Sequence, residues 1–259
     1  MNQNELKKSL SKLPLGKIKY FDSIGSTNDE ALAWAANYAR DLSLVVADEQ
    51  TAGRGRLDRK WFTPAGTALA FSLILRPSPA EQSHLSRIVG LAALSVADSL
   101  LKRGLSSQVK WPNDILLNGY KTAGVLTESV WSGDRVDCVV VGIGVNILKG
   151  SIPEAEILRF PAISLEDALG YPVERIEVLH DILATLITLR PGLGTEEFMT
   201  KWEELLAFRG EQVQIEEGNE TLITGKLLGL ESDGSLRLSN ENGKSLTVQF
   251  GDVRLRPSA

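Results

Sequence analysis

Apolar residues in the first part of the chain recur at helical spacing in some segments and form short extended runs in others. The helical spacing predicts helices over 29–40 and 82–103. Short apolar runs at 44–47 and 67–75 predict two strands, the second of which ends at an Arg-Pro-Ser-Pro sequence. Basic residues in the last turn of 82–103, with Gly104 just beyond, indicate where this long, half-buried helix ends.

The first helix follows three residues that favour the N-cap position, namely Ser26, Thr27 and Asn28. Thr27 and Glu30 have the spacing of a capping box, in which each side chain accepts a hydrogen bond from the backbone of the other residue. We therefore expect the helix to begin here with Thr27 as its cap.

After the long helix the pattern becomes extended. Segments 108–111, 114–117, 121–131 and 135–147 predict strands, and Asn118-Gly119 is a strong hairpin turn. Consecutive strands joined by tight turns pair in antiparallel fashion. We therefore expect a mixed or antiparallel sheet with flanking helices, an α+β fold rather than a doubly wound one.

The last part of the chain changes character after a helical region. Helical patterns at 164–169, 174–189 and 195–208 are followed, from Gly210 onward, by short alternating segments with turn sequences between them. The expected strands are 212–215, 221–230, 235–238, 244–250 and 253–255. Such short strands predict a small β-barrel. We therefore divide the chain into a domain of residues 1–209 and a barrel of residues 210–259.

Composition narrows the functional classes. Hydrophobic residues make up 43% of the chain and charged residues 24%, and no apolar run approaches the roughly 18 residues of a membrane span. The single cysteine, Cys138, excludes a disulfide framework and a multi-cysteine zinc site, and its place in an apolar strand predicts a buried, inert thiol. Only two histidines are present, so any metal should be held by oxygen atoms.

Charge and the N-terminal segment suggest where the protein acts. A formal net charge of -5 disfavours nucleic acid as a partner. The N-terminal segment lacks the apolar core of a secretory signal, which favours the cytoplasm, and no membrane partner is expected.

One short segment departs from the overall acidity. Between Gly53 and Trp61, three arginines and one lysine stand against a single aspartate, a local net charge of +3. Gly53 and Gly55 allow the backbone to approach a ligand closely, and guanidinium groups match phosphate oxygens. A solvated basic turn is the plain alternative, but the interleaved glycines favour a phosphate site.

Two further segments place chemistry at strand ends. Lys110 can direct a compact cation at a polarised phosphorus or carbonyl centre, with an ordinary surface lysine as the alternative. The Gly-Ile-Gly-Val-Asn segment at 142–146 lacks the third glycine and the following helix of a dinucleotide fingerprint, which excludes a Rossmann site. Its glycines instead permit close approach of a ligand, and Asn146 can offer an oxygen to Mg²⁺.

In their order along the chain, these segments resemble the biotin protein ligases (biotin-[acetyl-CoA-carboxylase] ligases). Each motif alone is weak, but their order and spacing are specific and extend from about residue 20 over nearly the whole chain. The matching segments are Ser26-Thr27-Asn28, Gln50, the loop 53–61, Lys110 to Asp114, Lys121 to Leu126 and Gly142 to Asn146. The family combines a catalytic α+β domain related to class II aminoacyl-tRNA synthetases with a small SH3-like barrel.

The resemblance implies biotin and ATP as substrates, with Mg²⁺. In the family, the biotin carboxylate attacks the α-phosphate of ATP to give biotinoyl-5′-AMP, and a lysine of a biotin carboxyl carrier protein then displaces AMP. Carried over by position, Ser26, Thr27 and Gln50, with Asn28 beside them, would bind the ureido end of biotin. Hydroxyl and amide groups suit a neutral urea.

The same resemblance gives roles to the basic segments. The loop containing Gly53, Arg54, Gly55 and Arg56 would close over biotin and the adenylate. Phosphate charge would be offset by Arg54, Arg56 and Arg59. Lys110 would bridge the biotin carboxylate and the α-phosphate, which makes Lys110 and Arg56 the catalytic candidates. Gly142 and Gly144 would line the floor of the biotin site, and Asn146 would lie near the phosphates and Mg²⁺.

Some questions stay open at this point. The loop departs from the family's fullest form, GRGRRGRxW, at Leu57 and Asp58, and Asp58 either pairs with a neighbouring arginine or faces solvent. The adenine-stacking residue is one of Phe160, Pro161 and Ala162. The acceptor's identity and the oligomeric state are undetermined, a homodimer being one possibility.

Two rival functions remain. A lipoate-protein ligase shares the fold and the adenylate chemistry, but it usually has an RRxSGGG-type segment in place of the glycine/arginine loop. A DNA-binding, biotin-sensing repressor needs an N-terminal helix-turn-helix domain, and only 25 residues precede Ser26. We therefore expect a ligase without DNA-binding function.

Overall fold

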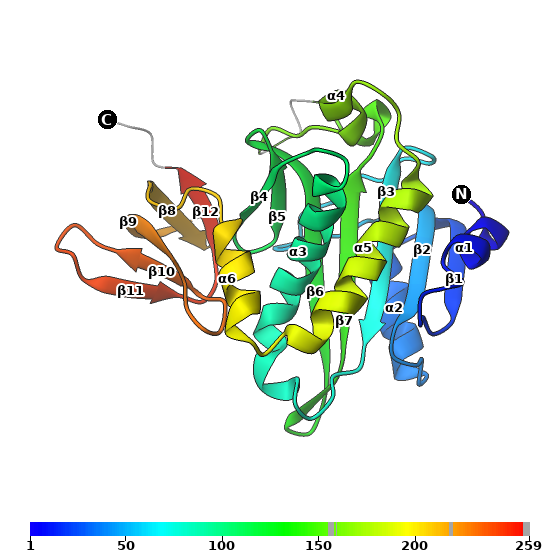
Figure 1. The fold of residues 1–259 in the computed structure, drawn as a ribbon, viewed down its shortest axis with the longest axis horizontal. Coiled ribbons are helices and arrows are strands. Elements are labelled where there is room, and N and C mark those ends of the chain that lie inside the picture. The colour runs from blue at the N-terminus through cyan, green and yellow to red at the C-terminus, as the bar shows by residue number, and fades with distance from the viewer. Residues whose placement is uncertain (155–157, 159, 218–219, 256–259) are drawn as a thin grey trace.

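The computed structural model describes residues 1–154, 158, 160–217 and 220–255, which form two sheets with helices around the first (Figure 1). The first sheet has the order β1-β2-β3-β7-β6-β5-β4; β1 and β2 pair in parallel, and all other neighbours are antiparallel. Its strands are β1 (Ile18–Ile24), β2 (Ser43–Gln50), β3 (Ala68–Leu75), β4 (Ser107–Lys110), β5 (Asp114–Leu117), β6 (Tyr120–Ser132) and β7 (Arg135–Asn146). The mixed sheet confirms the expected α+β fold.

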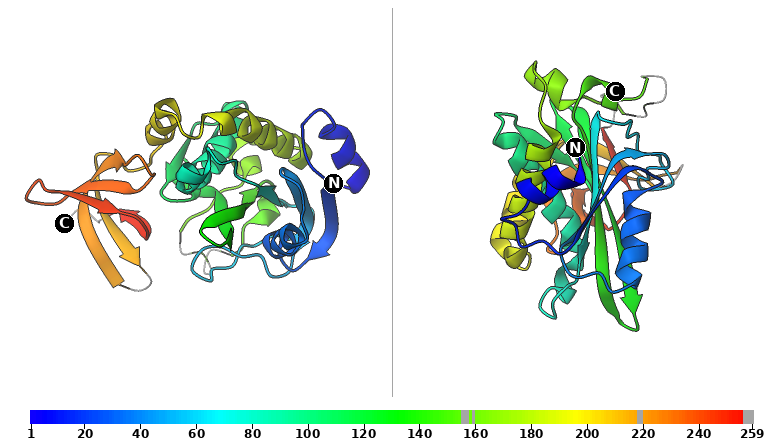
Figure 2. Two further views of the ribbon diagram at one scale, coloured as in Figure 1. Left: turned by 90° about the horizontal axis from the view of Figure 1, so that it is seen from below. Right: turned by 90° about the vertical axis from the view of Figure 1, so that its right-hand side faces the viewer.

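Helices cover both faces of this sheet (Figures 1 and 2). The helices α3 (Ile88–Leu101) and α5 (Arg175–Leu189) lie on one face, and α2 (Thr27–Ala36) lies on the other. Strand β3 is therefore buried along its whole length, as its continuous apolar sequence requires. The remaining helical elements are α1 (Gln3–Ser9), η1 (Gln82–Arg87), η2 (Lys149–Ser151), α4 (Leu165–Leu169), η4 (Arg190–Gly192) and α6 (Glu196–Glu204).

A second, smaller hydrophobic cluster lies on the α2 face, where α2 contributes mainly alanines. Ala31 and Ala35 of α2 pack against Val45, Val140 and Cys138 of the sheet. Cys138 has no exposed surface, and burial raises the pKa of its thiol. The prediction of a buried cysteine is therefore confirmed.

The second sheet contains only antiparallel neighbours, in the order β11-β10-β9-β8-β12. Its strands are β8 (Gln212–Glu217), β9 (Glu220–Leu230), β10 (Leu236–Ser239), β11 (Ser245–Val248) and β12 (Asp252–Leu255). We call this part the C-terminal unit. The turn expected at 217–219 falls on residues 218–219, outside the described residues. Two buried donors of the first part contact it: Trp111 Nε1 donates to the Gly234 carbonyl at 2.9 Å, and Arg87 Nε donates to the Ser232 carbonyl at 2.8 Å.

The structure corrects the expected start of the first helix. Its N-cap is Ser26 rather than Thr27, and the Ser26 side chain makes no capping hydrogen bond. The Thr27 hydroxyl donates instead to Gln50 Oε1 at 3.0 Å, so a tertiary partner replaces the predicted capping box. The helix also ends at Ala36, short of the expected residue 40.

Two other helices are shorter than predicted. The segment 82–103 divides into the 3₁₀ segment η1, which ends at Arg87, and the helix α3, which begins at Ile88; within η1, His84 has non-helical dihedral angles, φ -125° and ψ 17°. Gln82–Leu101 is long and apolar enough to cross a membrane by length and composition alone, but 67% of its most apolar window is buried inside the fold, as in a core helix. Helix α6 ends at Glu204 instead of continuing to residue 208.

Candidate functional site

One cavity of about 480 Å³ lies where the loop 51–61 meets the α2 face of the first sheet. Of the thirteen residues that the sequence assigns to substrates, eleven line this cavity: Ser26, Thr27, Asn28, Gln50, Arg54, Gly55, Arg56, Arg59, Gly142, Gly144 and Asn146. Gly53 and Lys110 are near it but do not line it. The fold therefore gathers candidates that are far apart in the chain.

The floor of the cavity is a part of β7 in which two alternate residues, Gly142 and Gly144, have no side chain. Cys138 packs under α2, and alternate residues of a strand face the same side, so Gly142 and Gly144 face the α2 side as well. A Cβ atom on Gly142 would overlap the amide of Asn28, and a Cβ atom on Gly144 would overlap the indole ring of Trp61. The two glycines are needed because they admit these side chains to the floor.

A neutral polar wall stands beside the floor. Gln50 Oε1 accepts a hydrogen bond from the Thr27 backbone N–H at 2.8 Å, and Gln50 Nε2 donates to Thr63 Oγ1 at 3.1 Å. Ser72 Oγ, which is fully buried in β3, lies 2.8 Å from Thr27 Oγ1. Amide and hydroxyl groups fixed in this way suit the polar end of a neutral ligand in a largely apolar pocket.

The loop is a short hairpin. A bridge joins Arg54 to Lys60, and the Trp61 N–H donates to the Gly53 carbonyl at 2.8 Å. A Cβ atom on Gly53 would overlap the Trp61 carbonyl, so this glycine permits two backbone segments to approach each other. A Cβ atom on Gly55 would make only an ordinary contact, 3.5 Å from the Arg59 carbonyl oxygen.

The hairpin tip has an unusual backbone conformation. Leu57 and Asp58 have φ angles of 54° and 55°, in the left-handed region that favours glycine. Such a conformation costs an L-residue roughly 1–2 kcal/mol, less where a short polar side chain is present. Both side chains are exposed, so the Asp58 carboxylate faces solvent, the second of the two alternatives from the sequence.

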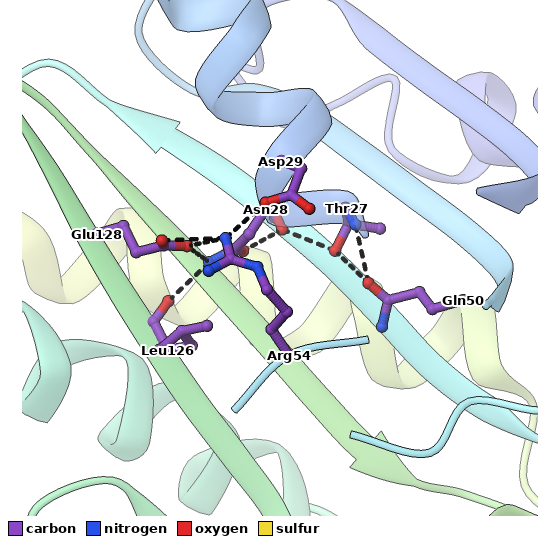
Figure 3. Close-up of polar contacts among 8 residues, drawn as sticks. Thr27, Asn28, Asp29, Gln50, Arg54, Leu126 and Glu128 are labelled. Atoms are coloured by element: carbon purple, nitrogen blue, oxygen red, sulfur yellow. Dashed lines mark hydrogen bonds and ion pairs between the residues drawn. The ribbon is translucent and has the colours of Figure 1, made fainter. Parts of the chain in front are cut away.

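The three loop arginines pair with carboxylates in the structure. Arg54 lies 2.6 Å from Asp29 Oδ1 and 2.7 Å from Glu128 Oε2 (Figure 3). Burial alone would lower the pKa of Arg54, but its contacts with Glu128 and Asp29 raise it above the ordinary value. Arg56 and Arg59 reach the C-terminal unit instead, where both pair with Asp252.

Arg56 has a different electrostatic setting from Arg54. It also donates to the Gly251 carbonyl at 3.3 Å. Burial lowers its pKa, and the attraction of Asp252 opposes that shift. A second anion at this place would relieve the cost of burying the guanidinium charge.

Two lysines lie at the other end of the cavity. Lys110 is buried, with 8% of its surface exposed, which excludes the surface-lysine alternative. Its Nζ lies 3.9 Å from Asp114 Oδ2 and 4.9 Å from the ring centroid of Phe160. Lys121 lines the cavity itself, with Nζ 2.6 Å from Asp114 Oδ1 and 5.4 Å from the ring centroid of Trp61. Burial lowers the pKa of Lys110, and Asp114 offsets part of that shift.

The residues that the sequence proposes for Mg²⁺ and for the adenine base also lie at this cavity. Asn146 is 6% exposed and lines the cavity, and an amide oxygen is an acceptable ligand for Mg²⁺ that keeps its waters and phosphate oxygens. Among the described residues, no group of three or more His, Cys, Asp or Glu side chains could hold a metal ion. Phe160 and Ala162 line the cavity, whereas Pro161 is exposed and does not.

Several residues of the site received no role from the sequence, among them Ser72, Lys121, Glu128 and Asp252. Lys121 was inside a matching segment and its charge was a usable signal. Ser72 and Glu128 are polar residues within strands, a weaker signal of a function. Asp252 had no signal, because its partners lie 193 and 196 residues away in the chain.

Comparisons with known proteins agree with this geometry. Residues 20–146 match the model of the biotin/lipoate A/B protein ligase family, and residues 208–256 match that of the biotin protein ligase C-terminal domain. The chain is 35% identical over 230 residues to biotin-[acetyl-CoA-carboxylase] ligase of Paracoccus denitrificans, covering 85% of this chain and 93% of that protein. It is 34% identical over 249 residues to the bifunctional ligase/repressor BirA of Bacillus subtilis, covering 94% of this chain and 76% of that protein.

A solved structure shows the same fold. The biotin protein ligase of Aquifex aeolicus in complex with biotin and ATP superimposes with a TM-score of 0.76 at 33% identity, covering 93% of this chain and 99% of that chain. The matches in sequence and in structure both extend across the cavity and the C-terminal unit. The chain therefore belongs to the biotin protein ligases of the biotin/lipoate A/B protein ligase family.

Proposed function

We propose that this chain is an ATP-dependent ligase that attaches biotin to one lysine of a biotin carboxyl carrier protein through biotinoyl-5′-AMP. The observation that carries the proposal is the composition of the cavity: a neutral polar wall at one end, and a basic loop with two lysines at the other. A neutral ligand with a carboxylate tail, joined to a nucleotide phosphate, matches that polarity. The family membership, and the relative from A. aeolicus described with biotin and ATP, support the same substrates.

The polar wall binds the ureido end of biotin. Ser26, Thr27 and Gln50 supply hydroxyl and amide groups, and Asn28 closes the wall next to Gly142. Ser26 and Thr27 are each 3% exposed, so a ligand group bound there is removed from water. A buried polar ligand group requires fixed partners, which these side chains supply.

The lysines and the loop arginines bind the reacting groups. In the first half-reaction a biotin carboxylate oxygen bonds to the α-phosphorus of ATP and pyrophosphate leaves. In the second, the carrier lysine nitrogen bonds to the biotinoyl carbonyl carbon, loses its proton and displaces AMP. We place Lys110 at the biotin carboxylate and the α-phosphate, where its charge stabilises the negative charge that develops in both steps. We place Lys121 beside it, because Lys121 lines the cavity and pairs with the same Asp114.

Arg56 and Arg59 close the site over the adenylate. Their ion pairs with Asp252 support this assignment, because both guanidinium groups already bind an anion. A closed loop also excludes water, which would hydrolyse the mixed anhydride. Arg54 contributes charge from its position between Asp29 and Glu128.

Mg²⁺ and the adenine base have separate candidates. Asn146 offers one oxygen, and Mg²⁺ when bound neutralises phosphate charge and orients the phosphate oxygens. Phe160 is the aromatic candidate for stacking on adenine, because it lines the cavity beside Lys110.

We also propose that residues 1–209 form the catalytic domain and that residues 210–259 form the SH3-like barrel. The separate antiparallel sheet and the C-terminal family match over 208–256 support this division. The cytoplasm as location stays a prediction.

The test is transfer of labelled biotin or labelled lipoate to a purified apo carrier domain in the presence of ATP and Mg²⁺. We expect biotin to be transferred and pyrophosphate to be released. Label transferred from lipoate but not from biotin would show that the chain is a lipoate ligase. Sequence-specific DNA binding without pyrophosphate release would support the repressor alternative.

A further inference from the structure

The side chain of Glu128, on β6, joins two parts of the site that are distant in sequence. Its Oε2 accepts a hydrogen bond from Asn28 Nδ2 at 2.7 Å. Its Oε1 and Oε2 accept hydrogen bonds from an Arg54 guanidinium nitrogen at 3.0 and 2.7 Å. The Glu128 carboxylate therefore lies between the base of the loop and the wall of the biotin pocket (Figure 3).

Asp29 pairs with the same Arg54 guanidinium as Glu128 does, but in the part of the chain that the structure describes Asp29 does not accept a hydrogen bond from Asn28. Its Oδ1 lies 2.6 Å from the Arg54 nitrogen, and its side chain is 59% exposed. Within the described residues, the Asp29 carboxylate makes no contact with the Asn28 side chain. Glu128, at 26% exposed, is the more buried of the two carboxylates.

The Asn28 amide is fixed at both of its ends. Asn28 Nδ2 points to Glu128 and, at 3.4 Å, to the Leu126 carbonyl. Asn28 Oδ1 accepts a hydrogen bond from Ser72 Oγ at 2.5 Å. A carboxylate can only accept hydrogen bonds, so it determines which end of the amide faces it. Loss of the carboxylate would remove the shorter of the two Nδ2 hydrogen bonds and leave only the 3.4 Å one to the Leu126 carbonyl, so the amide would be held less firmly against Ser72.

We propose that Glu128 is a positioning residue that couples the loop to the biotin pocket. It holds Arg54 at the base of the loop and, with the same carboxylate, sets the orientation of Asn28. Movement of the loop upon ligand binding therefore changes the position of the Asn28 amide, and the affinity for biotin depends on the position of the loop. This inference rests on the proposed function and adds to it the link between loop closure and biotin recognition.

The test compares Glu128→Gln with the matched control Asp29→Asn. Each removes one carboxylate charge from Arg54 without a change in size. Only the first also changes the acceptor of Asn28, because glutamine has one acceptor oxygen where glutamate has two, and its NH₂ group would oppose the N–H groups of Asn28 or Arg54. The measurements are the KM for biotin, kcat, the melting temperature, and the rate of tryptic cleavage in the loop with and without biotin. Trypsin is suitable because the loop holds three arginines and a lysine.

Glu128→Gln should raise the KM for biotin about tenfold, and biotin should no longer slow cleavage of the loop. A tenfold change corresponds to about 1.4 kcal/mol, within the range of a charge-assisted hydrogen bond. Asp29→Asn should change the biotin KM less than twofold. Equal effects of the two variants on the biotin KM and on loop protection would overturn the inference.

A double-mutant cycle separates positioning from a general structural effect. If Glu128 acts through Asn28, Glu128→Gln combined with Asn28→Ala should have the biotin KM of Asn28→Ala alone. Full additivity of the two effects would overturn the coupling. If Glu128→Gln does not fold, Glu128→Asp serves in its place and must raise the biotin KM at least threefold, and a wild-type value would contradict the inference. Failure of the wild-type chain to transfer biotin would instead contradict the proposed function.

Discussion

The indole ring of Trp61 lies against Gly144, in space that any side chain at residue 144 would need. Gly124 is the cross-strand partner of Gly144 in the sheet, and a Cβ atom there would lie 3.3 Å from Trp61 Cζ3. Two glycines on neighbouring strands thus leave the space into which the tryptophan of the loop packs. The contact ties the end of the loop to the floor of the cavity.

Gly144→Ala should push Trp61 off the floor. Overpacking of this kind costs roughly 1–3 kcal/mol, and here part of the cost should appear in ligand binding. We expect a lower melting temperature and a biotin KM raised about tenfold or more. Gly192→Ala is the matched control, because a Cβ atom there would make only an ordinary contact, 3.7 Å from Thr195 Oγ1. A biotin KM for Gly144→Ala equal to that of the control would contradict the assigned role of the glycine pair.

Lys121→Ala and Lys110→Ala should each lose most adenylation while still binding biotin. Each removes a cation close to the developing negative charge, and loss of one such group commonly costs 10²–10³ in rate. Pyrophosphate release measures adenylation, and calorimetry measures biotin binding. Lys201→Ala, an exposed helix lysine paired with Glu197, is the control. Near-normal turnover of Lys110→Ala would exclude the role proposed for Lys110.

The rate of adenylation should fall at a lower pH than it would if Lys110 had the ordinary pKa of a lysine. Burial lowers the pKa of Lys110, so its ammonium becomes neutral below the ordinary lysine range as the pH rises. The folded chain then binds fewer protons here than the unfolded chain, so this lysine's contribution makes stability rise with pH between the lowered and the ordinary pKa. Activity and stability should therefore move in opposite directions in that window.

The pH profile of pyrophosphate release, followed together with unfolding by denaturant, measures both quantities. Lys110→Arg keeps its charge throughout, so its alkaline fall should move to higher pH, although its rate will be lower. An unchanged profile in Lys110→Arg would show that another group titrates.

Arg56→Gly should release the adenylate before transfer. Removal of this guanidinium weakens the hold on the phosphate, so free biotinoyl-5′-AMP should appear in solution and label lysines of unrelated proteins. The measurement is the amount of labelled bystander protein relative to labelled carrier domain. Asp252→Asn is the comparison, because it loosens Arg56 and Arg59 without removing either of them. It should speed tryptic cleavage of the loop with less leakage, and retention equal to wild type in Arg56→Gly would refute the assignment.

Most strands were predictable because their signals are local, but β1 was not predicted from the sequence. Alternating apolar residues, Asn118-Gly119 and the other turn sequences fix hairpins, and hairpins fix antiparallel neighbours. β1 and β2 are parallel because the helix α2 forms the crossover connection between them. No local sequence signal indicates which strands a crossover helix connects. The antiparallel neighbours among β4, β5, β6 and β7 were therefore confirmed, whereas the pairings of β3 with β2 and β7, and the strand order, came only from the structure.

The candidate site was predictable where chemistry is concentrated in one segment. The glycines and arginines between Gly53 and Trp61 are easily identified in an acidic chain. The carboxylates that pair with those arginines cannot be identified from the sequence in the same way. Arg54 pairs with Glu128, 74 residues away, and Arg59 with Asp252, 193 residues away. The Thr27 hydroxyl likewise had a local partner in the sequence pattern and a distant one in the fold. The tertiary fold determines which of several chemically suitable partners lies within hydrogen-bonding distance of a polar group.

The contacts of Arg87 and Trp111 with the 232–234 turn have a consequence for cooperativity. Arg87 donates to both Leu193 and Ser232, and Trp111 directly follows Lys110 in the chain. Unfolding of the C-terminal unit alone would break both hydrogen bonds, at roughly 0.5–1.5 kcal/mol each, and would remove the covering of the buried Trp111 ring. The division visible along the sequence is therefore not a thermodynamic division: the two units should melt in a single transition, and the lysine end of the cavity should lose its order in the same event.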